Sequence, residues 1–158
     1  MSLACDLELA PAADGALSLR RAPVLPVGGV GIVVHDVSVP CMPGTRTVLE
    51  LRAAGGESKS YVVLTLDGDD ATLRVDRIDC GPDDLGGHFQ APATAPMPRG
   101  EAIDLRIVVD GCVLEIYAAD GMVAFTEQIY PDAPLTELVT HPPTQPADAP
   151  DTRDKEDA

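Results

Sequence analysis

Acidic side chains are the groups in this sequence with the clearest potential for chemistry. Two carboxyl groups about 5 Å apart, one with a raised pKa, are what an enzyme needs to hydrolyse a glycosidic bond with retention of configuration. Four places in the chain offer such groups: Asp69-Asp70, Asp76 with Asp79, Asp83-Asp84, and Glu115. Most of these residues fall in predicted turns or loops, where Asp is favoured because its carboxylate bonds the local backbone, so we predict structural roles for them.

Glu115 is different because it lies between Leu114 and Ile116 on a predicted strand. A half-buried carboxylate needs a partner, and pairing with an Arg or with a backbone N–H is a simpler explanation than catalysis. We therefore predict a structural role for Glu115 and no catalytic residue in this chain.

The spacing of histidine and cysteine does not indicate a metal site. Neither a His-x-x-x-His pair nor a Cys-x-x-Cys pair occurs among His35, His88, His141, Cys5, Cys41, Cys80 and Cys112. For Cys112 a packing role is favoured over nucleophilic catalysis, and Gly28-Gly29-Val30-Gly31 lacks the Lys-Ser/Thr of a phosphate-binding loop. We expect no metal, no cofactor and four reduced thiols. With no leader-like or membrane-spanning apolar run, the expected location is the cytoplasm.

Charge and aromatic content limit the partners. The formal net charge of −15 predicts repulsion from phosphate backbones and anionic membranes, so nucleic acid and membrane are excluded as partners. Aromatic residues make up only 3% of the chain, with no Trp. Rings that stack on sugars must therefore come from a set of five: Tyr61, Tyr117, Tyr130, Phe89 and Phe125.

The elements that position these residues have a period of two, which predicts half-buried strands. Alternation or short apolar runs predict strands at residues 17–19, 31–34, 47–51, 61–66, 72–76, 105–109, 112–117 and 122–130. Asp110-Gly111 is predicted as a two-residue hairpin turn with both residues at positive φ, and Ala119-Asp120-Gly121 as a second turn. Residues between Cys80 and Gly100 are predicted to form a long loop. The layout is all-β, with about ten strands in a two-sheet antiparallel β-sandwich.

The stretch 105–131 resembles the terminal hairpins of the C-terminal sandwich of glycoside hydrolase family 32. The family places an Asp at the first turn, a Glu and then an aromatic on the next strand, an Asp-Gly or Asn-Gly turn, and a closing aromatic-Pro pair. The matching residues here are Asp110, Glu115, Tyr117, Asp120, Gly121, Tyr130 and Pro131. Upstream, residues 73–77 resemble a family strand that ends in Val-Asp-Arg, and 14–24 resemble the segment that enters the sandwich. Gly111-Cys112 and Ala119 depart from the family pattern, which puts local turn hydrogen bonds in doubt.

The resemblance implies a concanavalin A-like, jelly-roll sandwich over residues 1–140, followed by a disordered, Pro- and Asp-rich acidic tail at 141–158. It also implies a parent β-fructosidase whose chemistry lies in a propeller N-terminal to the sandwich. The chain contains no Asn, no Arg-Asp-Pro and no Glu-Cys, so the propeller's three catalytic motifs are absent. We expect a non-catalytic accessory domain that packs an apolar face against the propeller and takes part in homo-oligomer contacts.

A carbohydrate-binding module for fructans or other glycans is the alternative function. The predicted long loop carries His88, Phe89 and Gln90, which are the candidate sugar-binding residues. The scarcity of aromatic residues weighs against this alternative, because stacking on rings normally supplies much of the affinity for sugars. Nothing positive in the sequence supports an independent enzyme of another class.

Overall fold

The computed structural model describes residues 3–11, 15–26, 31–55, 58–77, 79–81, 89 and 91–144. The regular elements in these ranges are eleven strands: β1 (Cys5–Pro11), β2 (Leu17–Pro23), β3 (Ile32–Pro40), β4 (Arg46–Ala53), β5 (Tyr61–Asp67), β6 (Thr72–Asp76), β7 (Ala93–Pro96), β8 (Ala102–Asp110), β9 (Val113–Ala118), β10 (Val123–Gln128) and β11 (Leu135–Thr144). Within the same ranges, no helix has the length and apolar character needed to cross a membrane.

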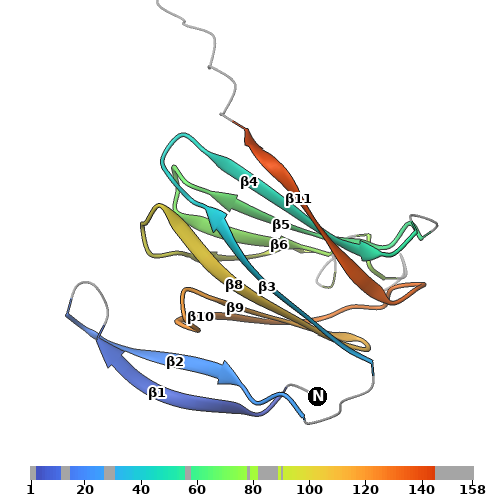
Figure 1. The fold of residues 1–158 in the computed structure, drawn as a ribbon, viewed down its shortest axis with the longest axis horizontal. Coiled ribbons are helices and arrows are strands. Elements are labelled where there is room, and N and C mark those ends of the chain that lie inside the picture. Colours follow the sequence, from blue (N-terminus) through green and yellow to red (C-terminus); the bar gives the residue numbers. More distant parts are fainter. Residues whose placement is uncertain are drawn as a thin grey trace, which may run out of the picture.

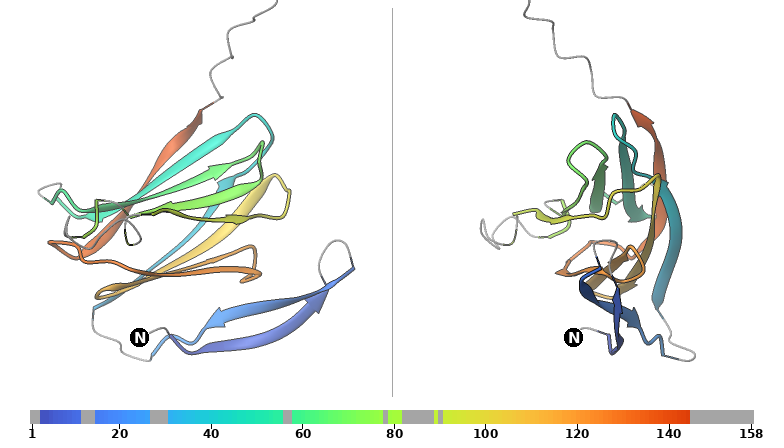
Figure 2. Two further views of the ribbon diagram at one scale, coloured as in Figure 1. Left: turned by 180° about the vertical axis from the view of Figure 1, so that it is seen from behind. Right: turned by 90° about the vertical axis from the view of Figure 1, so that its left-hand side faces the viewer.

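The strands form three layers (Figure 1). A five-stranded sheet in the order β11-β4-β5-β6-β7 faces a four-stranded sheet in the order β10-β9-β8-β3. The N-terminal hairpin, β1 paired with β2, lies beyond the four-stranded sheet, and the views from behind and from the side show the same arrangement (Figure 2). Neighbouring strands pair antiparallel throughout, which confirms the predicted two-sheet antiparallel sandwich.

The core lies between the two sheets and follows the predicted alternation. Leu64 and Leu66 of β5 point into it from the five-stranded sheet, and Ile107 of β8 and Ile116 of β9 point into it from the four-stranded sheet, all fully buried. Because successive side chains of a strand point to opposite faces, the residues between them reach the outer faces. Aliphatic side chains therefore fill this core, as the low aromatic content requires.

Three strands correct the sequence-based layout. β1 was not predicted, although Leu7 and Leu9 alternate there with acidic residues. β7 lies inside the predicted long loop and pairs with β6 at the sheet edge; its Ala-Thr-Ala-Pro sequence gives little contrast between its two faces. β11 runs four residues past the predicted domain boundary at 140, and a register shift after Leu135 breaks its alternation. The rest of the predicted tail, 145–158, lies outside the described residues.

The first predicted turn is shifted by one residue. Asp110 pairs with Val113 in the ladder between β8 and β9, so the two loop residues are Gly111 and Cys112. Gly111 has φ +58°, whereas Cys112 does not have a positive φ. The prediction of two positive φ values was therefore wrong. A two-residue hairpin turn of type II′ requires glycine at its first central position, which Gly111 occupies here.

Candidate functional site: the cleft under the N-terminal hairpin

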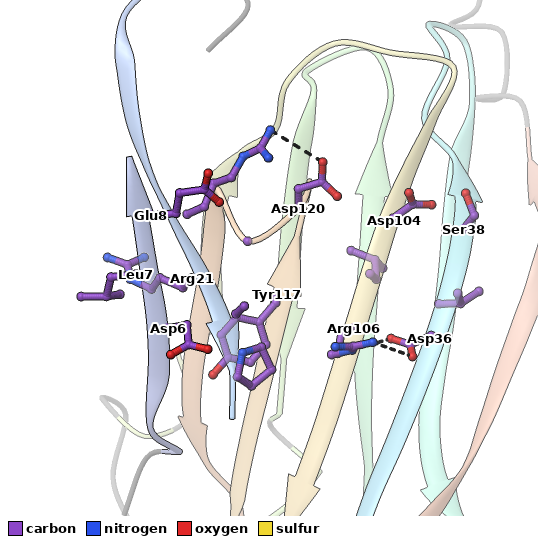
Figure 3. A pocket seen from close by; sticks show the side chains of 16 residues that line it. Asp6, Leu7, Glu8, Arg21, Asp36, Ser38, Asp104, Arg106, Tyr117 and Asp120 are labelled. Atoms are coloured by element: carbon purple, nitrogen blue, oxygen red, sulfur yellow. Dashed lines mark hydrogen bonds and ion pairs between the residues drawn. The ribbon is translucent and has the colours of Figure 1, made fainter. Parts of the chain in front are cut away.

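A cleft of about 700 Å³ separates the N-terminal hairpin from the outer face of the four-stranded sheet (Figure 3). Charged side chains from five elements or turns line it: Asp6 and Glu8 of β1, Arg20 and Arg21 of β2, Asp36 of β3, Asp104 and Arg106 of β8, and Asp120 of the turn after β9. The residues belong to strands far apart in sequence, and the sandwich topology brings them to one face.

Two ion pairs organise this lining. The Arg106 guanidinium donates to both carboxylate oxygens of Asp36, at 2.7 and 3.0 Å, and holds the pKa of Asp36 below its usual value. Arg20 of the hairpin lies 3.8 Å from Asp120. Both pairs are solvent-exposed, so each contributes little to stability. The two pairs place both guanidinium and carboxylate groups along the lining of the cleft.

Glu115 is buried beneath the N-terminal end of the hairpin. Leu114 and Ile116 point into the core, so Glu115 and Tyr117 point to the outer face of β9. The Leu3 N–H donates to Glu115 Oε1 at 2.9 Å, and the Tyr117 hydroxyl donates to Glu115 Oε2 at 2.7 Å. A backbone N–H was one of the two structural partners considered from the sequence. Its location, 112 residues away in the chain, could not be read from the pattern.

Tyr117 connects Glu115 to the hairpin. Its hydroxyl oxygen lies 3.2 Å from the Cys5 sulfur. Burial raises the pKa of Tyr117, and the contacts with Cys5 and Glu115 raise it further. The phenol therefore stays neutral and keeps the proton with which it bonds Glu115.

Gly121 provides a second point of contact for the hairpin. Its carbonyl oxygen accepts a hydrogen bond from the Arg21 N–H at 3.0 Å. A Cβ at Gly121 would overlap the Arg21 carbonyl oxygen and lie 2.8 Å from the carbonyl carbon. The residue also has φ +76°, where other residues are strained. Glycine in the Asp120-Gly121 turn is thus required by its backbone conformation and by the close approach of β2.

Phe89 is the one predicted sugar-binding residue that the structure describes, and it lies away from this cleft. Phe89 packs against Tyr130 with ring centroids 5.8 Å apart, and the Arg77 guanidinium lies 4.5 Å over the Phe89 ring. Arg77 is itself held by Glu127 of β10 at 2.6 Å. Tyr130 is exposed and lines a separate hollow of about 520 Å³. His88 and Gln90 lie outside the described residues.

Asp69 and Asp76, two other candidates that the structure describes, have structural partners. The Asp69 carboxylate accepts the Gly44 backbone N–H at 2.8 Å, and Asp76 pairs with Arg74. The backbone N–H groups of Asp69 and Asp70 donate to the Asp67 carboxylate. Asp83 and Asp84 fall outside the described part of the chain. Within that part, no group of three His, Cys, Asp or Glu side chains is arranged to hold a metal. All four cysteines are free thiols, and burial raises the pKa of Cys80 to about 11.

Comparison with known proteins places the sandwich in a family. Residues 36–143, from within β3 almost to the end of β11, match the model for the glycosyl hydrolases family 32 C-terminal domain. A levanase from Bacillus sp. (strain L7) is 37% identical over 90 residues, which cover 56% of this chain and 8% of the levanase.

Solved structures show the same fold. The exo-inulinase from Aspergillus awamori aligns with a TM-score of 0.59 and 13% identity over 87% of this chain and 32% of its own. The sucrose-6-phosphate hydrolase from Lactobacillus gasseri aligns with a TM-score of 0.55 and 22% identity over 89% and 31%. The chain therefore spans well under half of each of these relatives. On the match from β3 to β11, it belongs to the glycosyl hydrolase family 32 C-terminal domains.

Proposed function

We propose that this chain is the non-catalytic accessory domain of a β-fructosidase and that it stabilises a catalytic propeller domain by packing against it. The observation that carries the proposal is an apolar face on the N-terminal hairpin. Leu7, Leu9, Leu17 and Leu19 are 65%, 65%, 70% and 38% exposed. Exposed clusters of large apolar side chains mark surfaces that bind another protein.

The register of the hairpin puts these leucines on one side. Leu9 pairs with Leu19, and Pro11 pairs with Leu17, so their side chains share a face. The opposite face carries Glu8 and Arg20, which line the cleft. Leu7 pairs with Arg21 on the leucine face, so one Arg stands beside the four leucines, and Leu7 points away from the four-stranded sheet (Figure 3). A two-stranded hairpin is marginally stable alone. Its exposed leucines and its place at the entry to the sandwich support docking on the proposed propeller domain.

A chimeric enzyme tests this function. The catalytic domain of a levanase is joined to this chain in place of its own C-terminal region, and the melting temperature and thermal half-life of levan hydrolysis are measured. We expect the chimera to melt several degrees above the catalytic domain alone, because buried apolar area stabilises both partners. The control is the same chimera with Leu9→Ser and Leu17→Ser, which should lose most of the gain. Equal half-lives with and without this chain would contradict the proposal.

Carbohydrate binding is the second candidate function, and the Tyr130 ring carries it. Phe89 packs against this ring, Arg77 lies over the Phe89 ring in turn, and Tyr130 lines a hollow large enough for a sugar unit. Asp132 in the same hollow has its pKa lowered by hydrogen bonds from Ser58 and Ser60, so it is an ionised acceptor for sugar hydroxyls.

Titration calorimetry with levan and inulin separates this candidate from the first. If the hollow binds sugar, Tyr130→Ala should weaken affinity about tenfold or more, since an aromatic anchor is lost. Tyr61→Ala is the matched control, because Tyr61 is similarly exposed but lies on β5 and does not line the hollow. An unmodified chain that gives no heat with either polymer rules the second candidate out.

A further inference from the structure

Among the described residues, Glu115 is the one charged residue whose side chain is buried, with 1% of its surface exposed. It occupies the outer face of the four-stranded sheet, where the neighbouring strand presents the exposed side chain of Thr126 directly opposite it. The sandwich core does not cover this face. The N-terminal segment lies over Glu115, as its hydrogen bond with the Leu3 N–H shows.

The bonds to Glu115 join the N-terminal segment to the four-stranded sheet. Its two carboxylate oxygens accept from the Leu3 backbone and from the Tyr117 hydroxyl, and Tyr117 also contacts Cys5 at the start of β1. Shielding from water strengthens hydrogen bonds at such a buried site. The hairpin also contacts the sandwich through the Arg21–Gly121 backbone bond and the exposed Arg20–Asp120 pair.

We infer that Glu115 and Tyr117 form a latch that holds the N-terminal hairpin on the four-stranded sheet and so fixes the direction in which the chain enters the sandwich. Glu115 is a positioning residue in this inference, without a role in chemistry. One consequence rests on the proposed function: in a β-fructosidase, the latch would set the angle between this sandwich and the catalytic domain. The latch itself is a property of this chain alone.

The four cysteines make opening of the latch measurable. Cys112 is exposed, Cys5 is partly buried at the latch, and Cys41 and Cys80 are buried in the sandwich. A thiol reagent reaches a protected thiol only when the local structure opens. Cys5 therefore reports release of the hairpin, whereas Cys41 and Cys80 report opening of the sandwich.

The test compares Glu115→Gln, Tyr117→Phe and Glu127→Gln by the rate of labelling at each thiol and by hydrogen exchange over residues 3–23. Glu127→Gln is the matched control, because Glu127 is also largely shielded but pairs with Arg77 at another edge of the sandwich. Both latch variants should label Cys5 about tenfold faster and exchange faster in the hairpin, while Cys41 and Cys80 stay protected. Glu127→Gln should leave Cys5 at its original rate relative to Cys41 and Cys80.

Two results would overturn the latch. One is an unchanged Cys5 rate in both latch variants. The other is a Cys5 rate that rises only together with those of Cys41 and Cys80, which would make Glu115 a general stabiliser of the sandwich. Because the measurement uses the isolated chain, it is independent of whether the chimeric levanase gains stability.

Discussion

Replacing Arg77 with alanine should lower the free energy of unfolding by about 3 kcal/mol, because it removes one partner of a largely shielded ion pair. The side chains of Arg77 and Glu127 are 13% and 12% exposed, and their atoms approach to 2.6 Å. Arg77 follows β6 of one sheet and Glu127 belongs to β10 of the other, so the pair ties the two sheets together at one edge. The substitution strands the Glu127 carboxylate and removes the guanidinium from the Phe89 ring.

Urea denaturation measures this effect, and Arg74→Ala is its control. Arg74 also pairs with a carboxylate, that of Asp76, but its side chain is 44% exposed, so its loss should cost about 0.5 kcal/mol or less. The double variant Arg77→Ala with Glu127→Gln should recover part of the loss, because the stranded charge is gone. If Arg77→Ala unfolds at the same urea concentration as Arg74→Ala, the pair does not hold the sheets together.

The regular part of the fold could be predicted from single strands. β6 and most of β5 and β8 alternate, because one face meets the core and the other is less buried. β9 reads as a short apolar run and is buried on both faces, since the N-terminal segment lies over Glu115. β7 and β11 escaped prediction for physical reasons. A four-residue edge strand of small residues buries little, and a register shift puts the apolar residues of β11 out of phase.

The site was predictable only as far as single residues carry a signal. An apolar setting on both sides marked Glu115 as a residue in need of a partner. Its partners come from the N-terminal segment, and no periodicity links residues 112 positions apart. The sequence marks Arg77 only as the end of a Val-Asp-Arg resemblance. Its ion pair with Glu127 joins two sheets, so no local pattern indicates it. Long-range pairing is a property of the topology, which local patterns do not contain.

Gly121→Ala should displace β2 from the sandwich while leaving the two main sheets folded. The new Cβ would overlap the Arg21 backbone, and a backbone cannot move aside as a flexible side chain does. The φ of +76° adds conformational strain of about 1 kcal/mol for alanine. We expect the Arg21–Gly121 hydrogen bond to break, so the Arg21 amide should lose its protection from hydrogen exchange.

Gly111→Ala is the control that separates strain from contact. Gly111 has φ +58° in the hairpin turn between β8 and β9, but a Cβ there meets nothing within 4 Å. Both variants carry the conformational cost, and only Gly121→Ala carries the clash with β2. Hydrogen exchange at Arg21 should therefore be fast in Gly121→Ala and unchanged in Gly111→Ala. If the Arg21 amide exchanges at the same rate in the two variants, the hairpin does not depend on its close approach to Gly121. The Glu115 latch must then hold the hairpin without this second anchor.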